Sequence, residues 1–215
     1  MTGAELLTFT KSVLDDGLDI SDDFFYQLLN IAKTKLEGQR LWQYLKKLDS
    51  SNTASSGNNY TTGFTLPTDF AEDYKVKVGL DTEYLPVPFE EQQLYRNSSH
   101  RYYIDVGGNK FYLLGNGVGG VIYFFYKKFT DDITSSTSPL FPTRFHPLLG
   151  FMVAGMYQMG IDSDDVFARM GPANRQAAQE LERSMVSWDS SLAFHAQGDR
   201  IGVSNSDPDV SLEQM

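Results

Sequence analysis

The sequence predicts an α+β fold: a helical bundle with an inserted small antiparallel β module and an extended C-terminal tail. Three successive patterns of apolar residues indicate this. Apolar residues follow helical spacing before residue 49, alternate with polar residues between 64 and 129, and return to helical spacing after 139. We therefore expect a helical core domain from residues 1–59 and 130–194, an inserted β domain over 60–129 and a tail over 195–215.

Two amphipathic helices are expected in the N-terminal part. The first covers residues 4–15. The second begins after Ser21, whose hydroxyl suits an N-cap, and its helical spacing continues as far as Leu48. Lys46 and Lys47 would then occupy the last turn, where the helix dipole favours cations.

Two more helices are expected in the C-terminal part. Residues 144–160 are apolar almost all round, which predicts a buried helix. Residues 162–195 form the second, with an interruption at Gly171-Pro172 because proline cannot donate to the helical ladder. Beyond His195 the chain has turn formers, few apolar residues and no period, so we expect an extended segment there.

Strands are marked by alternating patterns rich in β-branched and aromatic residues. We expect them near residues 60–66, 74–79, 82–87, 101–106, 110–114 and 119–128. Turn residues predict one hairpin at 105–110 and another at the glycines of 115–120. Residues 88–98 suit a short helix between strands.

The composition excludes several classes of function. The 215 residues include no cysteine, so disulfides, thiolate metal sites and cysteine nucleophiles are ruled out. No stretch approaches the length of an apolar membrane span, so we expect no membrane association. The formal net charge of −10 argues against broad attraction to nucleic-acid phosphates, although an acidic protein can still surround DNA that slides past it.

The stretch GNGVGG, residues 115–120, raises the question of a nucleotide site, because glycines let backbone N–H groups surround a phosphate. A phosphate-binding loop needs a lysine and a hydroxyl residue after its last glycine, and Val121-Ile122 follow here. A dinucleotide fingerprint opens a helix, whereas VIYFFYKK has a strand pattern. The sequence therefore favours a turn over a cofactor site.

No catalytic or metal-binding set is evident. His100, His146 and His195 are isolated, and His146 suits a structural role beside Pro147 at a helix start. Four Asp-Asp pairs fit caps and turns, and no serine lies in a nucleophile elbow. We therefore expect no cofactor and no enzymatic activity.

Aromatic residues alternate through residues 102–126, and aromatic strands can stack single-stranded bases. The basic residues that a nucleic-acid groove needs are few: Arg101, Lys110, Lys127 and Lys128 only flank the run. A packed β core is the better interpretation.

The order of these segments resembles the head-to-tail connector (adaptor) proteins of tailed bacteriophages, especially short-tailed ones. The resemblance rests on the N-terminal helices, an LP-x-DF step at residues 66–70, the aromatic β insertion, and a helix from Pro147 to Met159 that precedes a final long helix. It covers residues 20–195.

The resemblance implies a structural virion protein at the head–tail interface, made in the host cytoplasm. It implies a homo-oligomeric ring, usually a dodecamer, that docks beneath the portal protein and extends the DNA channel. The ring would give the tail nozzle or fibre proteins their attachment site. Double-stranded DNA would pass through without specific binding.

The C-terminal tail is the candidate binding segment for the portal or for neighbouring subunits. Its apolar anchors are too few and too irregular for a core of their own, so a partner would supply the missing burial. The candidate anchors are Phe194, Ile201, Val203, Val210, Leu212 and Met215. Two alternatives stay open: a carbohydrate- or peptide-binding module that uses the aromatic β domain, and a small hydrolase with an unrecognised site.

Overall fold

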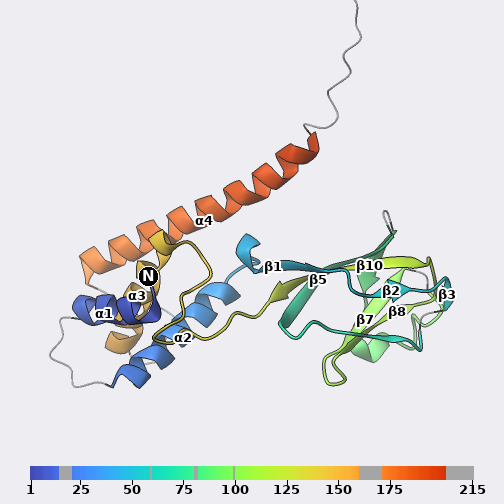
Figure 1. Cartoon of the computed structure of the whole chain (residues 1–215), viewed down its shortest axis with the longest axis horizontal. Coiled ribbons are helices and arrows are strands. Elements are labelled where there is room, and N and C mark those ends of the chain that lie inside the picture. The colour runs from blue at the N-terminus through green and yellow to red at the C-terminus, as the bar shows by residue number, and fades with distance from the viewer. Residues whose placement is uncertain (15–20, 59, 80–81, 99, 160–170, 202–215) are drawn as a thin grey trace, which may run out of the picture. The chain divides into compact units, whose positions relative to one another are not determined.

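The computed structural model describes all residues except 15–20, 59, 80–81, 99, 160–170 and 202–215. The chain forms two compact units, one of Met1–Tyr44 with Asp132–Met215 and one of Leu45–Asp131. We call them the helical unit and the β unit (Figure 1).

The described part of the helical unit is built from α-helices and a 3-10 turn. Its elements are α1 (Gly3–Val13), α2 (Asp22–Gly38), the 3-10 turn η3 (Thr143–Phe145), α3 (Pro147–Met159) and α4 (Pro172–Ile201). The Ser21 hydroxyl accepts a hydrogen bond from the backbone N–H of Phe24 at 3.3 Å, which confirms the predicted N-cap of α2.

Helix α3 is the centre of this unit, as its apolar sequence predicts. Leu148, Leu149 and Val153 are completely buried. Gly150 permits a close approach of α1, because a Cβ atom at this position would lie 2.7 Å from the ring of Phe9. The tight packing of α1 on α3 therefore depends on a residue without a side chain.

His146, just before α3, has the predicted structural role. It is 2% exposed, and its Nε2 and Nδ1 atoms lie 2.8 Å and 3.1 Å from the carbonyl oxygens of Phe141 and Met1. Burial lowers the pKa of His146 below its usual value. The imidazole thus links the N-terminal residue, Met1, to the start of α3.

Helix α2 ends earlier than the sequence predicts. It stops at Gly38, and the indole Nε1 of Trp42 then donates to the Leu36 carbonyl at 2.7 Å. After the 3-10 turn η1 (Gln43–Leu45), Lys46 and Lys47 lie in strand β1 (Lys46–Asp49) and not in a last helical turn. The helical prediction for this segment was wrong, because pairing with a distant strand outweighs the local apolar spacing.

Helix α4 begins at Pro172, where we predicted an interruption; residues 162–170 of the predicted helix lie outside the described residues. Proline suits a first helical position, since its missing N–H would have no helical partner there. At the other end the helix continues to Ile201, so the predicted extended conformation is wrong for residues 195–201. A single glycine, Gly198, does not end the helix, because adding one residue to an existing helix is much easier than starting a new one.

The described residues of the β unit form one large sheet and one small one. Besides β1, its elements are β2 (Thr53–Ala54), β3 (Gly57–Asn58), β4 (Gly63–Thr65), β5 (Phe70–Val78), β6 (Thr82–Pro86), the 3-10 turn η2 (Phe89–Glu91), β7 (Arg101–Asp105), β8 (Lys110–Leu114), β9 (Asn116–Gly117) and β10 (Gly120–Lys128). The large sheet has eight strands in the order β1-β10-β5-β6-β7-β8-β4, with β2 paired to β10, and β3 pairs with β9 separately. All pairs are antiparallel except β6 with β7. Only η2 and turns form where a helix was predicted at 88–98.

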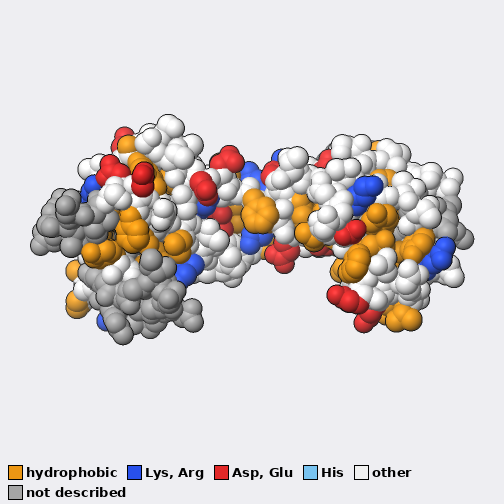
Figure 2. All heavy atoms as spheres, turned by 90° about the horizontal axis from the view of Figure 1, so that it is seen from below, with side chains coloured by type: hydrophobic (Ala, Val, Ile, Leu, Met, Phe, Trp, Pro, Cys, Tyr) orange, Lys and Arg blue, Asp and Glu red, His pale blue; other side chains and the backbone are white. Residues whose placement is uncertain are grey.

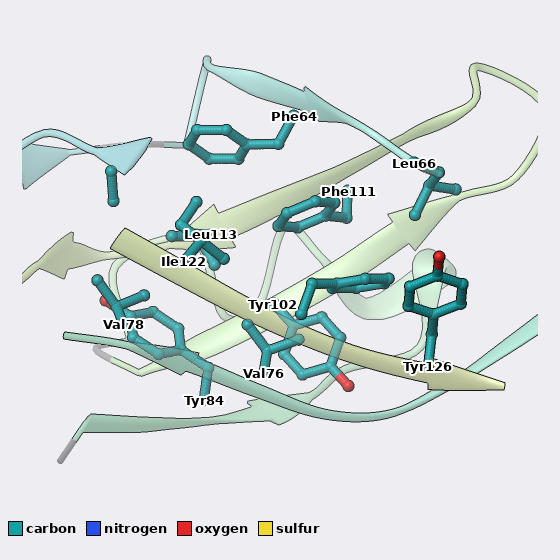
Figure 3. Packing of buried hydrophobic residues seen from close by; sticks show 12 residues of the cluster. Phe64, Leu66, Val76, Val78, Tyr84, Tyr102, Phe111, Leu113, Ile122 and Tyr126 are labelled. Atoms are coloured by element: carbon teal, nitrogen blue, oxygen red, sulfur yellow. The ribbon is translucent and has the colours of Figure 1, made fainter. Parts of the chain in front are cut away.

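The large sheet curls around its own core. Strands β8 and β10 are separated in the sheet by β5, β6 and β7, yet the rings of Phe111 and Phe124 stack at 4.7 Å. Figure 3 shows this core, in which side chains from opposite parts of the sheet converge. The buried aromatic side chains confirm the packed-core interpretation of residues 102–126.

The predicted hairpin at 105–110 is confirmed, since Asp105 pairs with Lys110 in the β7–β8 register. The predicted hairpin at 115–120 is wrong, because β8 and β10 are not neighbours in the sheet. This stretch instead crosses from one part of the curled sheet to the other, and β9 within it pairs with β3. Glycine is needed for a close approach, because a Cβ atom at Gly119 would lie 2.9 Å from the Ser56 backbone nitrogen.

The predicted fold class, a helical bundle with a small antiparallel β module and an extended tail, is wrong. The protein is a mixed α/β structure in which the curled eight-stranded sheet dominates, accompanied by four α-helices in the described part. The sheet is larger than predicted, because short strands such as β1 and β2 are extended only through their pairing with β10 and have no strand pattern of their own.

Candidate interaction surfaces

The LP-x-DF step forms the entry to β5 and fixes one margin of the β unit. Leu66 is 3% exposed and lies in the core beside Tyr126 (Figure 3). The Phe70 N–H donates to the Pro67 carbonyl at 3.1 Å, which closes a tight turn. The Asp69 side chain is therefore held at a defined position on the margin of the sheet.

Asp69 is the centre of a polar cluster. One carboxylate oxygen accepts a bond from the Tyr126 hydroxyl and the other from Lys47 Nζ, both at 2.8 Å. Burial alone would raise the pKa of Asp69, but the hydrogen bonds from Lys47 and Tyr126 outweigh it, so the net pKa is lowered. Burial, with the bond to Asp69, raises the pKa of Tyr126 to about 12. At neutral pH the cluster is thus a carboxylate, an ammonium and a neutral phenol.

A hollow of about 350 Å³ lies at this cluster. On one side it is lined by Lys47, Leu48 and Asp49 of β1, and on the other by Thr65 of β4 with Pro67 and Thr68. Strands β1 and β4 are the two ends of the sheet order. The hollow therefore marks the place where the curled sheet does not close; we call it the edge hollow.

A second surface combines aromatic rings with arginines on the β unit. The rings of Tyr103 and Tyr112 stack at 4.8 Å, and Phe89, 48% exposed, meets Tyr103 edge-on at 5.9 Å. Nearby, the guanidinium of Arg96 lies 4.5 Å from the ring centroid of Tyr60, and that of Arg101 lies 5.6 Å from Tyr95. Tyr103 belongs to a small buried cluster, and the other six residues, exposed or partly exposed, form the aromatic–arginine surface. Tyrosine and arginine are enriched at protein interfaces.

A third candidate is a groove of about 530 Å³ on the helical unit. Leu181, Ser184 and Trp188 of α4 line it on one side, and Arg144 and Phe145 line it on the other. The Trp188 ring lies 5.7 Å from that of Phe145. We call this the α4 groove.

The predicted anchors of the C-terminal tail are only partly within the described residues. Phe194 and Ile201 belong to α4, while Val203, Val210, Leu212 and Met215 lie outside the described residues. The edge hollow and the α4 groove escaped the sequence prediction, whereas the aromatic–arginine surface lies in the aromatic β domain that the carbohydrate- or peptide-binding alternative uses. The signal for the edge hollow was the LP-x-DF step, whose Asp69 and neighbours line it.

The described residues contain no group of three His, Asp or Glu side chains placed to bind a metal ion. Within the same residues, no helix is both long and apolar enough to cross a membrane. What they do present is hydrophobic side chains gathered in patches on the surface, with Lys and Arg beside several of them (Figure 2). Such patches are typical of a protein that docks onto other proteins.

The comparisons with known proteins agree with that class. A family model described as SU10 adaptor protein matches residues 1–200, and the chain therefore belongs to the SU10 adaptor protein family. This confirms the resemblance to phage head-to-tail adaptors. The chain is a phage adaptor protein and a virion component, and the family is structural and not catalytic. A search of curated proteins found no significant match.

Proposed function

We propose that the chain forms a homo-oligomeric ring, with dodecameric symmetry, that docks beneath the portal protein. The ring extends the DNA channel and provides the attachment site for tail nozzle or fibre proteins. Family membership over residues 1–200 is the observation that carries this proposal. The organisation into two compact units supports it, since each unit presents its own docking surface.

Ring formation requires two different complementary surfaces on each subunit, because head-to-tail contacts are heterologous. The α4 groove is our candidate for one of them. Its half-buried Trp188 lies beside exposed serines, so a neighbouring subunit could bury the indole without leaving a charge unpaired on that helix face. The aromatic–arginine surface is the candidate for contact with a tail protein.

The acidic balance of the chain fits a channel through which DNA moves. A formal charge of −10 gives the ring no broad attraction for phosphates, and a duplex can slide past it. We expect only weak binding to double-stranded DNA at physiological salt. Submicromolar affinity with a steep salt dependence would contradict this part of the proposal.

The C-terminal tail remains our proposed anchor to the portal, with neighbouring subunits as the second candidate. Truncation after Ile201 removes Val203, Val210, Leu212 and Met215 but keeps the whole of α4. The truncated chain should stay folded and lose its attachment to portal-bearing heads. Docking of the truncated chain with unchanged affinity would exclude residues 202–215 as the anchor.

Sedimentation of the purified chain, alone and with the portal protein, tests the proposal. We expect a 24.2 kDa subunit to enter a large ring, either by itself or on the portal. The variant Trp188→Ala should weaken this assembly, whereas Leu94→Ala, on the other unit and 81% exposed, serves as the matched control. A chain that stays monomeric with and without the portal would refute the ring.

The second candidate function is a carbohydrate- or peptide-binding module, which the aromatic–arginine surface favours. Exposed aromatic rings such as Phe89 stack on sugars or peptide side chains. Soluble glycans that bind a monomeric chain and lose affinity on Phe89→Ala would support this function over the adaptor ring.

A further inference from the structure

The two edges of the large sheet are unpaired, and they face one hollow. Among the described residues, β1 pairs only with β10 and β4 pairs only with β8. Each edge therefore carries backbone N–H and C=O groups that no neighbouring strand satisfies. The edge hollow of about 350 Å³ between them has room for side chains of another segment.

Edge strands are commonly protected against pairing by projecting lysines. Strand β1 has two lysines, but both are turned back onto the protein. Lys47 Nζ lies 2.8 Å from the Asp69 carboxylate, and Lys46 Nζ lies 5.6 Å from the centroid of the Tyr74 ring. These contacts hold both ammonium groups on side chains of the β unit, which weakens the usual protection of the β1 edge.

The charged side chains that line the edge hollow favour a positively charged ligand. The lining contains one cation, Lys47, and two carboxylates, Asp49 and Asp69. Asp69 is occupied by Lys47 and Tyr126. Among the described residues, Asp49 accepts hydrogen bonds only from the backbone N–H and hydroxyl of Ser51, at 3.0 Å and 3.1 Å. No described Lys or Arg lies within 4.0 Å of Asp49, so one carboxylate at the hollow lacks a cation.

We propose that the edge hollow is a strand-accepting site. An extended segment of a partner protein pairs with β1 through its backbone and places a Lys or Arg side chain against Asp49. Backbone pairing supplies affinity, and the alternate side chains that enter the hollow supply specificity. The proposal rests on the proposed function only for the source of the segment, which we assign to a tail component that attaches to the adaptor.

Residues 202–215 of the chain's own C-terminal tail do not fit this site, because of their charge. Residues 202–215 contain Asp207, Asp209 and Glu213 and no lysine or arginine, so they would add negative charge beside Asp49. The edge hollow and the C-terminal tail are therefore assigned to different partners.

The test uses the full chain and capped peptides of about six residues, the usual length of a strand. One peptide alternates threonine with lysine, and a second replaces lysine by glutamate; a third is the tail segment 202–215. Amide hydrogen exchange and NMR shifts report binding at each backbone position. We expect the lysine peptide to shift the amides of residues 46–49 and slow their exchange, and we expect no effect from the other two.

Two variants and a matched control locate the site. Thr65→Trp and Thr68→Trp fill the hollow from exposed positions and should abolish binding of the lysine peptide. Thr62→Trp, equally exposed but outside the lining, should leave it unchanged. Asp49→Asn, which keeps an acceptor for Ser51, should weaken binding about two- to fivefold at low salt.

The proposal would be overturned if the lysine peptide changed neither the NMR shifts nor the exchange rates of the β1 amides. Binding of the lysine peptide to both tryptophan variants would overturn it as well. If the glutamate peptide or the tail peptide bound as tightly as the lysine peptide, the proposed preference for a Lys or Arg side chain would be wrong. None of these outcomes bears on ring formation, because sedimentation with the portal measures that separately.

Discussion

Asp189 of α4 binds the segment Arg40–Gln43, which comes just before the β unit in the sequence. The side chain is completely buried, its Oδ1 accepts from the Gln43 N–H at 2.6 Å, and its Oδ2 lies 3.4 Å from the guanidinium of Arg40. Asp189→Ala removes both contacts. The hydrogen bond to a charged group contributes about 1.5–3 kcal/mol. The ion pair adds at most about 1 kcal/mol, because Arg40 is 36% exposed.

We therefore expect Asp189→Ala to lower the free energy of unfolding by about 1.5–4 kcal/mol in urea denaturation. Asp189→Asn keeps an acceptor for Gln43 and should cost about 1 kcal/mol. Ser190→Ala, exposed on the same helix, is the control and should change stability by less than about 0.5 kcal/mol. If Asp189→Ala behaves like this control, the buried carboxylate does not hold the segment in place.

Three further predictions follow from other buried contacts. Burial lowers the pKa of His146, so the unfolded chain binds a proton more readily; stability should fall as the pH drops below about 6.5, and His146→Gln should reduce that fall in paired urea titrations. Gly3→Ala should destabilise the chain by about 1–3 kcal/mol, because the added Cβ would meet the Thr134 carbonyl oxygen; an unchanged melting temperature would show that this contact is absent. Tyr102→Phe should cost about 1.5–3 kcal/mol through loss of the hydroxyl bond to Asp73, and a neutral result in urea would contradict that bond.

Local patterns predict the interior strands of the β unit well. Strands β7, β8 and β10 lie within about a residue of their predicted ranges, because one face of each is buried and its side chains alternate. Strand β1 was missed because Leu41, Leu45 and Leu48 mimic helical spacing and only pairing with β10 makes the segment extended. The dominance of the sheet was missed for the same reason.

The candidate surfaces depend still more on distant pairing. The sequence pointed to residues 66–70, but not to β1, which completes the edge hollow from the other side. The hairpin at 115–120 failed likewise, because consecutive strands need not be neighbours in a curled sheet. Side-chain periodicity specifies which face is buried and leaves the order of strands open.

The most direct test of the adaptor assignment is the position of this chain in the virus particle. Electron cryo-microscopy of particles that carry a labelled copy of the chain would show that position. We expect a ring of label at the single tail-bearing vertex, between the portal and the tail. Label over the whole capsid, or particles without label, would contradict it.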